Sequence, residues 1–349
     1  MKQNNPLKVG LISVGVPWFD QEVADRNLAE TRAWLEQSWS VVGPQAVVVD
    51  TSTLEAAILD FQTSHRPQVL IIQIGTFPDG EVPLRIAEQI RVPIIIHSLP
   101  EPEIDKRIAI NSLCGANLTT FTLTEMGFAH KAIHGFVSDP QVQVQMTAFI
   151  RAGMVLAELK SKRIGLIGFR APGFYPCVFD ELLIRRNFGV GIDHIPLSEV
   201  VLELQKGNQK PAPVKHFPRI EGGELPAASV ESIEKYYTAL GAVLERGGHG
   251  LFAIKDWPEI MGLEDPGGIW PGLGWLLDEG YLLAPEGDVN AALTMAILHG
   301  LTRSTPFFAD ISAWDDETNA LALWHYGGAP SLARDPQEIR YGEEGREVQ

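Results

Sequence analysis

Short apolar runs that alternate with amphipathic segments are the feature of this sequence that most constrains its fold. KVGLISV at residues 8–14, AVVV at 46–49, VLIIQI at 69–74 and PIIIH at 93–97 are apolar almost throughout and are predicted as strands, and segments with helical spacing separate them. Strands that are apolar on both faces are typical of a parallel sheet covered by helices on both sides. Residues 1–157 are therefore predicted to form a doubly wound, Rossmann-like α/β domain.

The same pattern continues in the middle of the chain. Helical spacing from Val142 to Lys160 leads into the apolar run RIGLIG, and further strands are predicted at GLFAIK and YLLA. Residues 158–301 thus predict a second doubly wound α/β domain. Within it, residues 205–227 contain four prolines and few apolar residues, and this composition predicts a surface loop.

After Leu301 the pattern changes to short strands. FFADIS and NALALWHYGG flank the polar turn WDDET, which predicts an antiparallel pair. The last residues are highly charged and are predicted to form a mobile tail. Residues 302–349 are therefore predicted to be the start of a β-rich C-terminal domain.

Composition excludes several classes of partner. The formal charge is −16, with 28 scattered basic residues against 44 acidic ones, whereas proteins that bind nucleic acid or anionic membranes need clustered Lys and Arg. No apolar stretch reaches the roughly 18–20 residues of a membrane span, and no signal peptide is recognised. Cys114 and Cys177 form no C-x-x-C pair. A cytoplasmic protein is predicted.

Three side chains that follow predicted strands are candidates for chemistry. In open α/β sheets, ligands bind beyond the carboxyl ends of the strands. Glu259 follows GLFAIK, Asp288 follows YLLA, and His325 ends LALWH. Two carboxylates and one imidazole can hold Mn²⁺ or Mg²⁺. Each also has an ordinary structural interpretation, as a solvated loop acid, an N-cap of the helix predicted at 289–301, or a core histidine.

Other catalytic motifs are absent from the sequence. His130 and His134 form H-x-x-x-H, assigned here to a plain helix face, but Lys131 stands where the zinc protease motif needs glutamate. There is no G-x-G-x-x-G after the first strand, no P-loop and no G-x-S-x-G elbow. Dinucleotide binding, P-loop nucleotide binding and α/β-hydrolase activity are therefore not indicated.

Four motifs in a fixed order carry a resemblance to a known family. IKDWPE, EGDVNAALTMAILHGLT, FFADIS and ALWHYGGAPSLA together resemble the L-fucose isomerase and related proteins group, within the wider fucose/arabinose isomerase superfamily. NSLCGANL and GFRAPGF fit the same likeness, which covers residues 8–334. Members of that family continue after the last motif into a full β-barrel-like C-terminal domain, so the resemblance implies that this domain is truncated here, either because the sequence is a truncated one or because the protein is a shortened form.

The resemblance implies a metal-dependent sugar isomerase. In that family a divalent metal, usually manganese, is held by a glutamate, an aspartate and a histidine, which fall on Glu259, Asp288 and His325. The implied reaction interconverts an aldose and a ketose through a cis-enediol, and Glu259 and Asp288 would be the catalytic pair. The open-chain substrate would be a fucose-like or arabinose-like sugar or a modified hexose, such as a sulfonated one.

Further residues are predicted to contact the sugar. Arg170, in GFRAPGF, offers a fork of donors to a hydroxyl or an anionic group. Trp257 and Trp324 present rings that can stack on a sugar face. The resemblance also implies that Phe77 and Trp18 lie in loops that reach a neighbouring subunit's pocket, in a homo-oligomer with sites near its subunit interfaces.

Two other functions stay open at this level. Two doubly wound domains around a cleft also describe non-catalytic carbohydrate-binding proteins, which need no metal and usually carry an export signal or a DNA-binding helix-turn-helix. Neither feature is visible here. A metal-dependent sugar aldolase or epimerase would keep the same ligands and polarise a different carbonyl.

Overall fold

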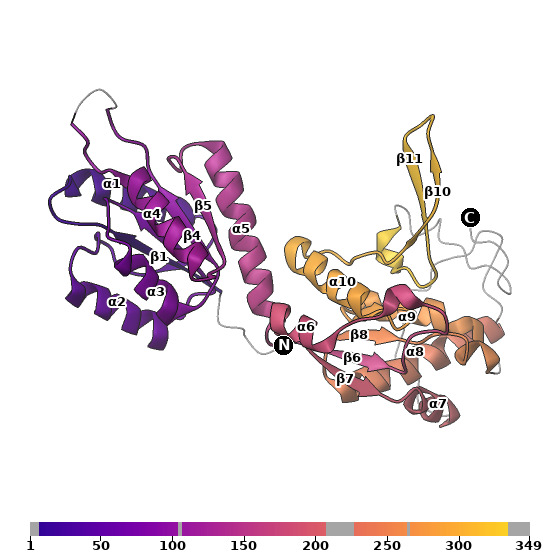
Figure 1. The fold of residues 1–349 in the computed structure, drawn as a ribbon. Helices are drawn as coiled ribbons and strands as arrows, with labels where there is room; N and C mark the ends of the chain where they lie inside the picture. Colours follow the sequence, from indigo (N-terminus) through magenta and orange to yellow (C-terminus); the bar gives the residue numbers. More distant parts are fainter. Residues whose placement is uncertain (1–6, 104–106, 207–226, 264–265, 334–349) are drawn as a thin grey trace. The chain divides into compact units, whose positions relative to one another are not determined.

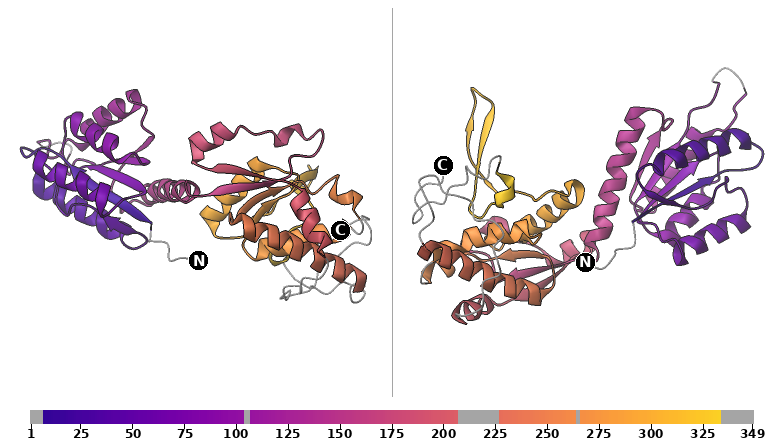
Figure 2. Two further views of the ribbon diagram at one scale, coloured as in Figure 1. Left: turned by 90° about the horizontal axis from the view of Figure 1, so that it is seen from below. Right: turned by 180° about the vertical axis from the view of Figure 1, so that it is seen from behind.

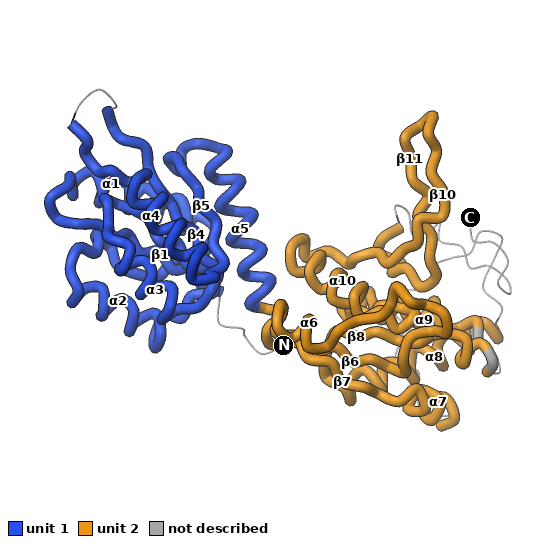
Figure 3. Tube along the Cα trace, viewed as in Figure 1, with its two compact units in different colours: residues 1–157 blue, residues 158–349 orange. Residues whose placement is uncertain are grey.

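A computed structural model describes residues 7–103, 107–206, 227–263 and 266–333 (Figure 1). The chain divides into two compact units, unit 1 at residues 1–157 and unit 2 at residues 158–349 (Figure 3). Each unit is an α/β structure with a parallel sheet of its own, so the predicted fold class is confirmed for both. The predicted tail lies outside the described residues, and so does nearly all of the predicted loop at 205–227.

Unit 1 is built on a five-stranded parallel sheet with the order β2-β1-β3-β4-β5. Its strands are β1 (Lys8–Val14), β2 (Ser40–Val42), β3 (Val69–Ile74), β4 (Ile94–Ser98) and β5 (His130–His134). Its helices are α1 (Gln21–Leu35), α2 (Thr51–Thr63), α3 (Glu81–Ile90), α4 (Ser112–Glu125) and α5 (Pro140–Leu159).

Helices cover both faces of this sheet (Figures 1 and 2). Leu70 and Ile72 of β3 pack with α2, α3 and α4, whereas Val69 and Ile71 face the opposite side, which α1 and α5 cover. All four side chains are completely buried. Burying one such side chain stabilises the fold by about 1.5–3 kcal/mol, which explains why these strands are apolar without alternation.

Unit 2 contains a four-stranded parallel sheet with the order β7-β6-β8-β9 and a separate two-stranded hairpin. Its strands are β6 (Arg163–Ile167), β7 (Gly191–Ile195), β8 (Leu251–Ile254), β9 (Leu282–Ala284), β10 (Asp310–Asp315) and β11 (Ala320–Trp324). Its helices are α6 (Glu181–Phe188), α7 (Ser198–Gln205), α8 (Ala227–Gly247), α9 (Ile269–Asp278) and α10 (Val289–Thr302), with short 3₁₀ turns η1 (Tyr175–Cys177), η2 (Ile260–Gly262), η3 (Pro266–Gly268) and η4 (Pro330–Leu332).

The hairpin of β10 and β11 confirms the predicted antiparallel pair. Every residue of both strands is exposed, and Trp314 is 72% exposed. The larger β-rich domain that the hairpin was expected to begin stays a prediction. In the described ranges, none of the helices combines the length and the apolar composition that crossing a membrane requires.

Two local predictions for unit 1 are wrong. AVVV at 46–49 forms no strand, because Asp25 binds the Val47 N–H at 2.9 Å and Asp50 already caps α2, so only Val48 pairs with β1. His130 and His134 lie on strand β5, not on a helix. Gly127, with φ +73°, follows the end of α4, and the chain then pairs with β4 along its whole length.

Helices α4, α7 and α9 and strand β7 were not predicted. Helix α9, IWPGLGWLLD, contains a proline and two glycines, which count against a helix in an isolated sequence. Close packing explains these glycines. A Cβ at Gly274 would clash with the Gly328 carbonyl, and one at Gly272 would lie 3.1 Å from the Tyr237 amide nitrogen.

Candidate active site

The loops after β6, β8 and β9 meet at the carboxyl edge of the unit 2 sheet. The three strands are parallel neighbours, so these loops leave the sheet at the same edge. Two backbone hydrogen bonds join them, from the Lys255 N–H to the Ile167 carbonyl at 2.9 Å and from the Gly287 N–H to the Ile254 carbonyl at 2.7 Å. Arg170, Glu259 and Asp288 lie on these loops, as the topology argument requires.

The turn after β9 packs directly on the loop after β6. Glu286 and Gly287 adopt left-handed backbone conformations, with φ +62° and +69°. A Cβ on Gly287 would collide with the Phe169 carbonyl oxygen and would lie 3.0 Å from the Arg170 Cα. Only glycine allows the two loops to approach this closely.

Glu259 lies at the surface of this edge. Its side chain is 50% exposed and forms an ion pair with Lys255, four residues earlier. The hydrogen bond from the Lys255 ammonium holds the pKa of Glu259 below its ordinary value. Glu259 is therefore a carboxylate at neutral pH, with a cation beside it.

Asp288 begins helix α10. Its side chain accepts a hydrogen bond from the Ala291 N–H at 2.9 Å, which confirms the predicted N-cap. Cys177, in η1, is buried nearby. Burial raises the pKa of the Cys177 thiol to about 11, and the charges of Asp288 and Glu286 act in the same direction. The thiol is therefore neutral at physiological pH.

His325 follows β11, and its side chain is only 4% exposed. Its Nδ1–H donates to the Tyr326 carbonyl at 2.9 Å, and its Nε2 lies 3.6 Å from Glu286 Oε1. Burial lowers the pKa of His325, but the bonds to Glu286 and to the Tyr326 carbonyl outweigh burial, so the pKa lies above its ordinary value. The acid that His325 faces is thus Glu286.

The structure does not gather the three predicted metal ligands into one group. Glu259 pairs with Lys255, Asp288 caps α10, and His325 faces Glu286. Within the described ranges, no three His, Cys, Asp or Glu side chains lie close enough together to hold a metal ion. In this arrangement the side chains do not fit a divalent cation, and the metal site stays a prediction.

Asp256 and Glu286 are site residues that the sequence analysis missed. Asp256 is 2% exposed. It accepts hydrogen bonds from Trp270 Nε1 at 3.0 Å and from the Glu286 N–H at 2.8 Å. Burial raises its pKa, and the two donors oppose that shift. The sequence did point to both residues, because IKDWPE and PEGD each contain two acids, of which only the second was taken as a candidate.

Arg170 lies on the same edge without a carboxylate partner. Its guanidinium carbon is 5.6 Å from the centroid of the Phe169 ring and 5.2 Å from that of Tyr175. Its Nε is buried and has no hydrogen-bond partner. Over the part of the chain that the structure describes, no acid forms an ion pair with it.

The predicted aromatic contacts are spread over both units. Trp257 packs edge to face on a ring of the β6 loop, 5.0 Å between centroids, and its peptide bond to the next proline is cis. Trp324 ends β11, with its ring centroid 6.4 Å from that of His325. Phe77 and Trp18 follow β3 and β1 in unit 1, and Trp18 is 70% exposed. Sugar contact by any of the four stays a prediction.

Comparison with known proteins gives the class of the molecule. The chain is 28% identical over 326 residues to sulfoquinovose isomerase of Alkalicoccus urumqiensis, covering 91% of this chain and 72% of that protein. It is 26% identical over 333 residues to sulfoquinovose isomerase of Priestia megaterium (92% and 73%), and 23% identical over 282 residues to L-arabinose isomerase of Nocardioides sp. (76% and 56%). No family model matches the chain.

These similarities support a sugar isomerase of the fucose/arabinose isomerase type. The relatives are named sulfoquinovose isomerase and L-arabinose isomerase, so the narrower resemblance to L-fucose isomerase itself is not supported. The chain is accordingly an enzyme, an aldose–ketose isomerase of the intramolecular oxidoreductase class.

Proposed function

We propose that the carboxyl edge of the unit 2 sheet catalyses aldose–ketose isomerisation of an open-chain sugar through a cis-enediol. The observation that carries this proposal is the meeting of the β6, β8 and β9 loops, which brings Glu259, Asp288 and Arg170 to one edge. In the reaction, a base removes the proton from C2 of the aldose and a proton is delivered to C1, while the proton of the C2 hydroxyl moves to the C1 oxygen, which gives the ketose.

Glu259 and Asp288 are the proposed proton-transfer pair. Glu259 is exposed and is held as a carboxylate by Lys255, so it can accept a proton at neutral pH. Asp288 is fixed at the start of α10 by its cap bond to Ala291, which gives its carboxylate a defined position. Moving both the carbon-bound proton and the hydroxyl proton takes two positioned groups, and the pair supplies an accessible carboxylate and a fixed one.

We also propose a divalent cation, Mn²⁺ before other metals, with Glu259, Asp288 and His325 as its ligands. Such an ion stabilises negative charge that develops on sugar oxygens. Because these side chains have other partners in the structure, the cation would have to replace the Lys255 and Glu286 contacts. Metal analysis of the purified protein, before and after chelation, tests this directly.

Arg170 suggests which sugars bind. The Nε of Arg170 is buried and has no hydrogen-bond partner, and guanidinium groups bind sulfonate-like and phosphate-like anions through paired N–H donors. Two relatives are named for sulfoquinovose, a sulfonated hexose. We propose that the substrate is a hexose with an anionic substituent, of which sulfoquinovose is the first candidate, and that Arg170 binds this group.

The experiment is a panel of sugars followed by NMR in D₂O, with and without added Mn²⁺. The panel contains sulfoquinovose, glucose 6-phosphate, glucose, L-arabinose and L-fucose. We expect a ketose product from sulfoquinovose with deuterium at C1, because the enediol exchanges its proton with solvent. A cleaved or epimeric product would instead favour the aldolase or epimerase, and bound but unchanged sugar would favour a non-catalytic carbohydrate-binding protein.

A homo-oligomer and a cytoplasmic location are further parts of the proposal. In the proposed assembly, Phe77 and Trp18 contact the site of a neighbouring subunit. Light scattering of the purified protein gives the oligomeric state, and a monomer with full turnover would contradict the proposed role of these two residues.

A further inference from the structure

Asp256 binds the backbone of Glu286 and the side chain of Trp270, on which the segment that contains His325 packs. One of its carboxylate oxygens accepts the Glu286 N–H at 2.8 Å, and the other accepts Trp270 Nε1 at 3.0 Å. We propose that Asp256 is the positioning residue that sets the geometry of the Glu286–His325 pair from both sides. This inference rests on the proposed function of the same sheet edge.

The first connection runs through the turn after β9. Glu286 has a left-handed backbone, which is unfavourable for a residue with a side chain and needs support from its surroundings. Asp256 supplies that support by binding the Glu286 N–H. With the backbone fixed in this way, the Glu286 carboxylate reaches to 3.6 Å from His325 Nε2.

The second connection runs through α9. The Trp270 ring stacks on the Tyr326 ring, 4.6 Å between centroids and 26° between planes. The Tyr326 carbonyl accepts the His325 Nδ1–H, and a Cβ at Gly327 would lie 3.0 Å from the Trp270 carbonyl oxygen. The segment that contains His325 therefore lies directly on Trp270, whose orientation Asp256 fixes.

The chemistry of this position requires a carboxylate. Both partners are N–H donors, and an ionised carboxylate is the side chain that offers two acceptor oxygens and no donor. Asparagine has the same shape, but its amide nitrogen would face one of the two donors. Asp256 is almost completely buried, so solvent is poorly placed to supply the missing acceptor.

The first test is Asp256→Asn, measured by NMR and by steady-state kinetics. We expect the signal of the Trp270 indole N–H or of the Glu286 amide to move and to exchange faster, together with the amide signal of Tyr326. We expect kcat per folded molecule to fall about 10–100-fold while KM changes less than about twofold. The variant would displace His325, a residue of the proposed site, and misplacing a fixed group slows the reacting complex more than it weakens binding.

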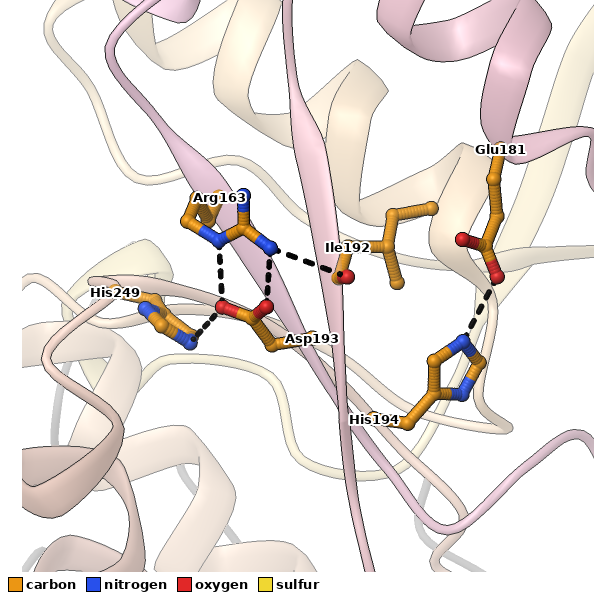
Figure 4. A network of polar contacts seen from close by, with 6 residues as sticks. All are labelled: Arg163, Glu181, Ile192, Asp193, His194 and His249. Carbon is orange, nitrogen blue, oxygen red and sulfur yellow. Dashed lines mark hydrogen bonds and ion pairs between the residues drawn. The ribbon is translucent and has the colours of Figure 1, made fainter.

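Asp193→Asn is the matched control, because Asp193 is also a carboxylate of unit 2 with two partners, Arg163 and His249, away from this pair (Figure 4). It is expected to leave kcat unchanged, with only a small loss of stability. A fall in kcat of the same size in both variants would assign the loss to removal of a carboxylate from unit 2 in general and would overturn the proposal. Unchanged NMR signals in Asp256→Asn would overturn it as well.

Trp270→Phe provides a second variant that keeps the ring stack and removes only the N–H donor. Its effect on kcat is expected to be smaller than that of Asp256→Asn, and the double variant is expected to lose less than the product of the two single losses. Fully multiplicative losses would contradict a shared connection. A wild-type chain that isomerises no sugar would contradict the proposed function, whereas the NMR measurement would still decide whether Asp256 fixes the pair.

Discussion

The two parallel sheets of this chain differ in how exposed the polar side chains at the carboxyl ends of their strands are. In unit 1, Ser13, Gln73 and His97 stand side by side across β1, β3 and β4, and all three are completely buried. In unit 2, the corresponding edge presents the half-exposed carboxylate of Glu259 and the unpaired guanidinium of Arg170. The same architecture thus has buried polar side chains at the edge in unit 1, called the closed edge below, and accessible charged side chains at the edge in unit 2. The fold alone does not say which edge carries the function.

The difference comes from how each unit uses its post-strand polar groups. In unit 1, the Glu101 carboxylate accepts three consecutive backbone amides, those of Ala109, Ile110 and Asn111. Ser112 donates to the Ile74 carbonyl and accepts the Leu99 N–H, which ties the ends of two strands together. The side chains of Glu101 and Ser112 are thus engaged in hydrogen bonds that hold backbone segments of unit 1 together. The first prediction tests whether the unit 2 groups are instead available for chemistry.

The largest effect is expected when the proposed proton-transfer pair is changed. Glu259→Gln and Asp288→Asn should each lower kcat/KM by about 10³-fold, because general acid–base groups contribute about 10²–10⁴. Asparagine also caps helices well, so α10 should survive in Asp288→Asn, as circular dichroism would show. Asp50→Asn, the same cap chemistry on α2 of unit 1, should leave turnover unchanged. If either variant of the pair retains turnover, that residue has no catalytic role.

The next effect concerns two glycines with similar positive φ angles, Gly287 in unit 2 and Gly127 in unit 1. Gly287→Ala should cost about 3–4 kcal/mol of unfolding free energy, since a left-handed alanine is strained and its Cβ meets the Phe169 carbonyl. Gly127→Ala, at φ +73° with nothing within 4 Å, should cost only about 1–2 kcal/mol from backbone strain. Urea unfolding measures both. Equal losses would show that the loop contact in unit 2 is not tight.

A pH dependence should distinguish the closed edge of unit 1 from unit 2. Burial lowers the pKa of His97 to about 4, from an ordinary value of 6.5. Between these pH values the unfolded chain binds a proton that the folded chain does not, so stability falls as the pH falls from 6.5 to about 4. The loss is about 3 kcal/mol, at about 1.4 kcal/mol for each pKa unit.

Hydrogen exchange of the β3 and β4 amides, corrected for its intrinsic pH dependence, measures this loss in unit 1. The β8 amides serve as the comparison in unit 2. His97→Gln should remove the extra slope, whereas His65→Gln, at an exposed histidine, should not. The same slope in β8 would argue against His97 as its source.

The smallest effect is expected at the exposed ion network of unit 2 (Figure 4). Asp193 accepts a hydrogen bond from Arg163 Nε at 2.6 Å, which holds the pKa of Asp193 below its ordinary value. Because both side chains are more than a third exposed, Asp193→Asn should cost only about 0.5 kcal/mol. A thermal melt of the variant should therefore nearly overlay that of the wild type, and a loss as large as that at Gly287 would be inconsistent with solvent screening.

Most of the two parallel sheets could be predicted from the sequence, because a strand buried on both faces is apolar over its whole length. β1, β3 and β4 follow directly from KVGLISV, VLIIQI and PIIIH. Helix α9 could not be predicted, because packing against distant backbone, as at Gly272, decides its conformation. Strand β5 could not be predicted either, because its polar sequence HKAIH carries little of the apolar signal.

The edge that carries the candidate site could also be predicted, because acids after neighbouring parallel strands must lie near one another. Which acid faces which partner could not. Glu286 rather than Asp288 faces His325, and this depends on a left-handed turn that Asp256 fixes from another loop. Such pairings arise from contacts between segments that are far apart in the sequence.

The burial of Cys177 makes this chain convenient for labelling. Its thiol stays protonated near neutral pH and is shielded, and thiol reagents attack the thiolate. Cys114, on α4, is exposed. A maleimide dye should therefore attach at Cys114 alone, and the natural sequence provides a single-site fluorescent reporter on unit 1 without any cysteine having to be replaced.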